Sequence, residues 1–294
     1  MTALHIPRIA CEIAPERVIA ARANEAGTSI DILSTRTLPA GALVPGLASA
    51  NVASPAAVRD AVADALAAIS GRGRDVIAIL PDASVRIVLL DFESLPEKRQ
   101  DADPVVRFRL KKSLPFDIED AALSYDTHRS NGAVKVVAAV TPMAVRQEYE
   151  GIFRSAGYSP GVMVPSMLSA LGPVDATDPT LILKVDANTT SVAIVQNNDL
   201  LLYRTLENAR AGTVAAEALA DDIYPSLVFF QDTYGSSVTR ILLAGLASAR
   251  ELGAALEAQT GARVSDLVSS SQVGTQGNLP ASLAASVVGA LLGV

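Results

Sequence analysis

The feature that most constrains the fold is a pattern of three short apolar segments that occurs twice in the 294 residues. In the later copy, residues 181–206, aliphatic and β-branched segments are separated by polar turns, as expected for three antiparallel strands. The weaker copy, residues 8–38, has the same order, with turns at Pro15-Glu16 and at residues 25–28. This repeat predicts a duplicated α/β protein in which each half begins with a β-meander.

An acidic residue precedes the first turn of each copy, Glu12 in one and Asp186 in the other. A duplicated meander with these acids resembles the two-lobed fold of actin, Hsp70 and the sugar kinases. In that fold, two turns face each other across a cleft and hold the phosphates of ATP. The resemblance implies that the turns at residues 14–16 and 187–189 face each other.

The chemistry of the two turns argues against a nucleotide. Phosphate-binding turns use glycine, which lets the backbone N–H groups approach the anion closely. Here Pro15 removes a donor, Glu16 adds a negative charge, and Asn188 stands at the glycine position. We therefore expect no cofactor, and interpret Glu12 and Asp186 as turn-capping side chains. If Mg-ATP binds after all, the expected contacts are Asp186, Asn188, Thr189 and Gly245.

Composition sets the class of protein and of partner. With 50% hydrophobic and 19% charged residues the chain is folded, and a net charge of −7 disfavours nucleic acid and anionic membranes as partners. Cys11 is the single cysteine of the chain, which excludes an intrachain disulfide, and it falls in a predicted buried strand. Two histidines and one cysteine form no metal-ligand pattern, and no catalytic motif is present. The apolar tail, residues 279–294, is expected to pack inward and not to insert into a membrane.

Periodicity and turn residues predict the remaining elements. We expect a compact inserted subdomain at residues 84–140, built from a strand, a helix, a corner at Leu114-Pro115-Phe116 and two more strands. Helices are predicted at residues 55–70, 142–156, 166–171, 213–234, 249–260 and 283–292, and further strands at 75–80 and 241–244. The predicted division is a first lobe (1–83), the inserted subdomain with a return helix (84–160), a second lobe (161–278) and a C-terminal helix that returns to the first lobe (279–294).

A resemblance to one family follows from the order and spacing of scattered residues along nearly the whole chain. The chain resembles the PilM family of type IV pilus assembly proteins at Arg86, Leu95-Pro96, Arg107, Leu114-Pro115-Phe116, Asp120, Tyr125, Ala156-Gly157, Asp186 and Ala244-Gly245. The resemblance implies an actin-like fold and a cytoplasmic protein that binds the N-terminal tail of the inner-membrane protein PilN, in a groove beside the inserted subdomain. The altered turns then imply a pseudo-ATPase.

Two functions from different classes stay open. One is a non-catalytic adaptor of a type IV pilus or type II secretion machine, recruited to the inner membrane by a PilN-like tail and contacting other assembly proteins or copies of itself. The other is an ATP-binding protein whose nucleotide state regulates partner binding. Leu114, Pro115 and Phe116 either line the partner groove or form the buried corner of the subdomain.

Overall fold

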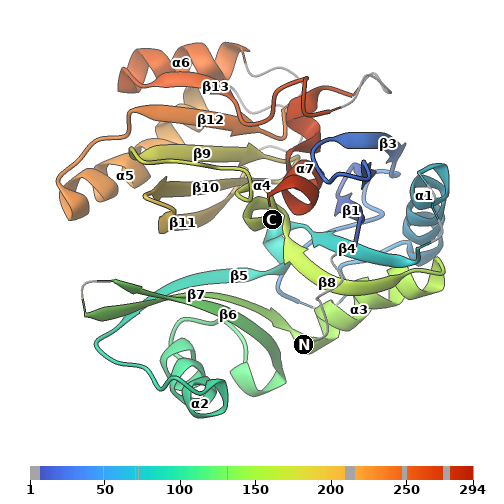
Figure 1. Cartoon of the computed structure of the whole chain (residues 1–294), viewed down its shortest axis with the longest axis horizontal. Helices are drawn as coiled ribbons and strands as arrows, with labels where there is room; N and C mark the ends of the chain where they lie inside the picture. Colours follow the sequence, from blue (N-terminus) through green and yellow to red (C-terminus); the bar gives the residue numbers. More distant parts are fainter. Residues whose placement is uncertain are drawn as a thin grey trace.

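The computed structural model describes residues 7–48, 50–69, 71, 73–130, 132–208, 216–246, 250–273 and 279–293. Within these residues the strands form two five-stranded sheets and one three-stranded sheet. The two large sheets belong to two lobes, and the small sheet belongs to a subdomain below the second lobe (Figure 1).

The first lobe is built on a sheet with the strand order β3-β2-β1-β4-β8. The first three strands form an antiparallel meander, and β4 and β8 continue the sheet in parallel. The bounds are β1 Ile9–Ala14, β2 Arg17–Ala23, β3 Ile30–Thr37, β4 Asp75–Leu80 and β8 Ser159–Pro165.

The second lobe repeats this arrangement, with the order β11-β10-β9-β12-β13. Again three strands form an antiparallel meander and the next two are parallel. The bounds are β9 Thr180–Val185, β10 Thr189–Gln196, β11 Asp199–Glu207, β12 Arg240–Ala244 and β13 Arg263–Asp266. The equal strand orders confirm the predicted duplication.

Helices cover both large sheets. One face of the first sheet packs against α1 (Pro55–Ala68) and α3 (Met143–Ser155), and the second sheet packs against α5 (Ala216–Tyr234) and α6 (Arg250–Thr260). Between the sheets lie α4 (Ser166–Ala170) and α7 (Ala285–Leu292), as Figure 1 shows. The side chains of α7 are buried against β1 and β2, so the apolar tail packs inward as expected.

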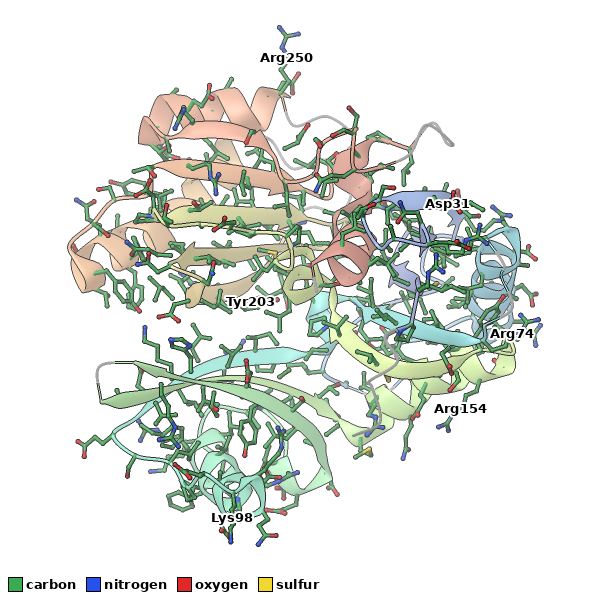
Figure 2. The ribbon with its side chains drawn as sticks, in the orientation of Figure 1. Asp31, Arg74, Lys98, Arg154, Tyr203 and Arg250 are labelled. Carbon is green, nitrogen blue, oxygen red and sulfur yellow. The ribbon has the colours of Figure 1, made fainter. Side chains whose placement is uncertain are left out.

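The inserted subdomain has the sheet order β5-β7-β6, with α2 packed on it. Its elements are β5 Arg86–Phe92, α2 Arg99–Leu110, β6 Ala121–Ser130 and β7 Ala133–Pro142. The subdomain also touches the second lobe, because Asp199 lies 3.5 Å from both Lys135 Nζ and His128 Nε2. Tyr203 lies at the edge of the second lobe that faces the subdomain (Figure 2).

One predicted boundary is wrong. The division at residue 160 cuts β8, which pairs with β4 from Asp75↔Ser159 to Leu80↔Pro165 and so belongs to the first lobe. Pro160 and Gly161 hid this strand in the sequence, since both are poor strand residues. They are tolerated because β8 is an edge strand, so an N–H on its outer side has no neighbouring strand to bond to and can be missing without loss. The short strand β13 was also not predicted, and residues 213–215 of the predicted long helix lie outside the described residues.

Candidate functional site

The two predicted turns line one cleft between the lobes. The cleft has a volume of about 710 Å³, and its wall includes Pro15 of the first turn and Asp186, Asn188 and Thr189 of the second. The expected facing of the turns is therefore confirmed. Asp82, which precedes β5, lies on the same wall and was not predicted.

Gly245 has a different position and a structural reason for being glycine. It follows β12 with a φ of +82°, and a Cβ atom there would lie 2.2 Å from the carbonyl oxygen of Val185. Its N–H donates to the Ser282 carbonyl oxygen at 2.9 Å. Gly245 is not among the residues that line the cleft, although its backbone packs against Val185, the residue before Asp186.

Asn208 holds the second turn in place. Its backbone N–H donates to the Asn188 carbonyl oxygen at 2.9 Å, and its Nδ2 donates to the Asp186 carbonyl oxygen at 2.8 Å. Its Oδ1 accepts from the Thr190 hydroxyl at 2.7 Å. The N–H of Asp186 donates to the Thr189 carbonyl oxygen, so this donor is not free for a phosphate. Asn188 does not take the left-handed conformation that glycine supplies in such turns.

The first turn adds charge of both signs beside Asp186. Arg17 follows Pro15 and Glu16, and its guanidinium lies 3.8 Å from the Glu16 carboxylate and 3.9 Å from Asp186 Oδ1. Asp186 Oδ1 and Arg17 Nε are buried without a hydrogen-bond partner. The two turns are therefore joined by a loose ion pair across the cleft.

Below the turns lies a buried cluster centred on Lys184. Its Nζ donates to Asp186 Oδ2 and lies 3.5 Å from Glu12 Oε1, which also accepts from the Ser166 hydroxyl. The interpretation of Glu12 and Asp186 as turn-capping side chains is wrong, because their carboxylates bind these buried groups instead. The sequence held one signal for this cluster: Lys184 is a single charge in an otherwise apolar strand.

The pKa values of the cluster have identifiable causes. Burial alone would lower the pKa of Lys184, but Asp186, Glu12 and Asp82 outweigh it, so the pKa of the ammonium group is raised. Burial raises the pKa of Asp82 to about 6, although Lys184 opposes the shift. Asp82 accepts from the Met167 N–H and from the Ser191 hydroxyl, each at 2.8 Å. These bonds hold its carboxyl group in one orientation.

The residues at the two turns do not fit a metal-bound polyphosphate. Lys184 is already paired with Glu12 and Asp186, and Arg17 lies near Glu16 and Asp186, so neither cation beside the turns is free for a phosphate. Pro15 offers no N–H to a phosphate, and the N–H of Asp186 is already bonded to the Thr189 carbonyl oxygen. Within the described residues, no group of three or more His, Cys, Asp and Glu side chains is arranged to hold a metal ion.

A second concave site lies between the first lobe and the inserted subdomain. This groove has a volume of about 240 Å³ and is bounded by the edge strands β8 and β6. Its lining is mainly apolar, with one guanidinium from Arg146; the residues of β6 and β8 that line it are Ala122, Leu123, Ser124, Pro160, Gly161, Met163 and Pro165. The groove lies where the sequence predicts a partner site, but none of its residues was predicted.

Leu114, Pro115 and Phe116 lie in the corner between α2 and β6, away from this groove. Leu114 and Phe116 are partly buried against the core of the subdomain, and Pro115 is exposed. None of the three lines the groove between β6 and β8. Their packing favours the role of a structural corner over that of a peptide contact.

Comparisons with known proteins agree on the architecture. No family model and no curated protein sequence matches the chain. Among solved structures, a chain of the PilM-PilN type IV pilus biogenesis complex is similar, with a TM-score of 0.83 and 21% identity over 98% of this chain and 99% of that one. The cytoplasmic domain of EpsL, an inner-membrane component of the type II secretion system of Vibrio cholerae, gives a TM-score of 0.51 and 9% identity over 80% of each chain.

A protein of unknown function from Bacteroides thetaiotaomicron is also similar in structure. It has an actin-like ATPase fold and gives a TM-score of 0.54 and 9% identity, over 90% of this chain and 91% of that one. Together with the duplicated sheets and the facing turns, these likenesses show that the chain has the actin-like ATPase fold with a small inserted subdomain.

Proposed function

We propose that this protein is a non-catalytic adaptor of a type IV pilus or related type II secretion machine, and that it binds the N-terminal cytoplasmic tail of a PilN-like membrane protein. The observation that carries the proposal is the groove between β6 and β8. It lies beside the inserted subdomain in a fold similar to that of a chain of the PilM-PilN complex.

The groove suits an extended peptide. Both β6 and β8 are edge strands, and an extended segment can add to such an edge through main-chain hydrogen bonds. Leu80, Val85 and Ala139 contribute apolar surface for alternate side chains of the peptide. Pro160 and Pro165 lack N–H groups, so β6 offers the more regular ladder of donors and acceptors.

The rest of the protein is consistent with a recruited adaptor. No helix within the described ranges is long and apolar enough to cross a bilayer. As part of the same proposal, the protein acts in the cytoplasm and reaches the inner membrane through its PilN-like partner. The alternative, an ATP-regulated protein, requires phosphate binding at turns where Pro15 lacks an N–H and the N–H of Asp186 is already bonded.

The groove can be blocked without disturbing the fold. A Cβ atom at Gly161 would meet nothing within 4 Å, so Gly161→Arg places a long side chain in the groove at little structural cost. Gly151→Arg in α3 is the matched control, because its Cβ position is equally open and it does not line the groove.

The test is calorimetric titration with a synthetic peptide of the N-terminal tail of the PilN-like protein from the same genome. We expect binding to the wild type and to Gly151→Arg without nucleotide, and an affinity lowered at least about tenfold for Gly161→Arg. Equal affinity of all three proteins would place the tail elsewhere. Failure of the wild type to bind would overturn the adaptor function.

A further inference from the structure

The buried cluster around Lys184 crosses the boundary between the two lobes. Lys184 belongs to β9 of the second lobe, whereas Glu12 belongs to β1 of the first, and their charged atoms are 3.5 Å apart. The exposed fraction of the side chain is 3% for Lys184, 4% for Glu12 and 8% for Asp186. The lobes are thus joined by charged groups that are largely shielded from water.

Most of the charged and polar groups in the cluster have a hydrogen-bond or ion-pair partner. The Ser166 hydroxyl donates to Glu12 and shares a second hydrogen bond with the Ser286 hydroxyl of α7 at 2.8 Å. Asp82 of the first lobe accepts from the Ser191 hydroxyl of β10 at 2.8 Å. A buried charge is tolerated when it is paired and hydrogen-bonded, and removal of one partner leaves the others uncompensated.

The position of the cluster matters as much as its partners. Glu12 and Lys184 occupy equivalent places in the duplicated halves, because each lies two residues before the residue that flanks its turn, Ala14 in the first half and Asp186 in the second. The ammonium group of Lys184 contacts both Glu12 and Asp186 from within the protein.

We propose that Lys184 is a built-in counter-ion that links the two lobes in place of a metal-bound nucleotide. The lobes therefore stay closed without any ligand, and the cleft does not act as a nucleotide switch. A second ion pair across the cleft, between Arg17 and Asp186, supports the same closure. This inference does not depend on the partner, because the groove between β6 and β8 lies outside the cleft.

The first experiment uses the unmodified protein. Hydrogen exchange of β1, β9 and their turns is measured after treatment with EDTA and again with Mg-ATP. We expect strong protection without ligand and less than about twofold change with Mg-ATP. A slowing of about tenfold or more at the two turns would overturn the proposal, because the lobes would then be closed by ligand.

The second experiment removes the charge. In Lys184→Met the long apolar stem is kept but Glu12 and Asp186 lose their cation, so exchange in β1 and β9 should be accelerated at least about tenfold. Lys112→Met, at an exposed position after α2, is the control and should exchange like the wild type. Unchanged exchange in Lys184→Met would overturn the proposal.

A double variant keeps the test decisive if Lys184→Met folds poorly. Glu12→Gln combined with Lys184→Met restores the wild-type net charge and neutralises one of the two buried carboxylates that lose their cation, so more of the folded protein should be recovered than with Lys184→Met alone. A double variant that behaves as the sum of two independent defects would show that Glu12 and Lys184 are not coupled, which contradicts the proposed link.

Discussion

Asp82 allows a quantitative test of the buried cluster, because burial raises the pKa of its carboxyl group from 3.8 to about 6. The folded protein therefore binds this proton more tightly than the unfolded chain. Its contribution to stability is complete below pH 3.8 and is lost as the pH rises through about 6. The shift corresponds to about 3 kcal/mol in total, of which about 2 kcal/mol falls between about pH 4.5 and pH 7.5.

The perturbation is Asp82→Asn, which removes the titration but keeps an oxygen that can accept from the Met167 N–H. The free energy of unfolding is measured by urea denaturation of both proteins across this pH range. Relative to the wild type, Asp82→Asn should gain about 2 kcal/mol from the acidic to the neutral end. Asp60→Asn, at an exposed position of α1, should show no such trend. A wild-type to Asp82→Asn difference that does not change with pH would refute the reasoning.

Three further outcomes follow from single features. Phe116 packs against the subdomain core but is partly exposed, so Phe116→Ala should lower the free energy of unfolding by about 2 kcal/mol, less than the 3–5 kcal/mol of a fully buried ring. The affinity for the tail should not change, and a lower affinity in a stable variant would show that Phe116 contacts the peptide. Gly289→Ala, whose Cβ would lie 2.0 Å from the Ser169 carbonyl oxygen, should destabilise by about 3 kcal/mol, whereas Gly151→Ala should be neutral or stabilising in thermal unfolding. Calorimetry with Mg-ATP should detect no binding at millimolar nucleotide, because the two turns lack free donors for a phosphate, and a micromolar dissociation constant would contradict this argument.

Local patterns were enough to predict the duplicated meanders. Each strand of the pattern is a run of apolar residues bounded by turn residues. A buried strand requires such apolar residues, so the run is visible in the sequence. The helix from Pro55 and the inserted subdomain were predicted for the same reason. The strand β8 was not, because Pro160 and Gly161 are read as loop residues until it is known that the strand lies at a sheet edge.

The site was harder to predict because its residues come from distant parts of the chain. Asp186 and Asn188 could be identified from their turn. Asn208 is identified only by its contacts, and the single charge of Lys184 in its strand does not show which acids it pairs with. Glu12 and Ser166 are 154 positions apart in the sequence, and a local sequence pattern cannot predict a hydrogen bond between such distant residues. The partner groove has the same origin, because it exists only where β6 and β8 come together.

The central claim, that a peptide tail binds between β6 and β8 without nucleotide, is tested most directly by hydrogen exchange of the complex with the PilN-like tail. The account predicts slower exchange in Ala121–Ser130 and Ser159–Pro165, and unchanged exchange at the turns around Pro15 and Asn188, whether or not Mg-ATP is present. Protection at the two turns instead, or protection of the groove only after Mg-ATP is added, would contradict it.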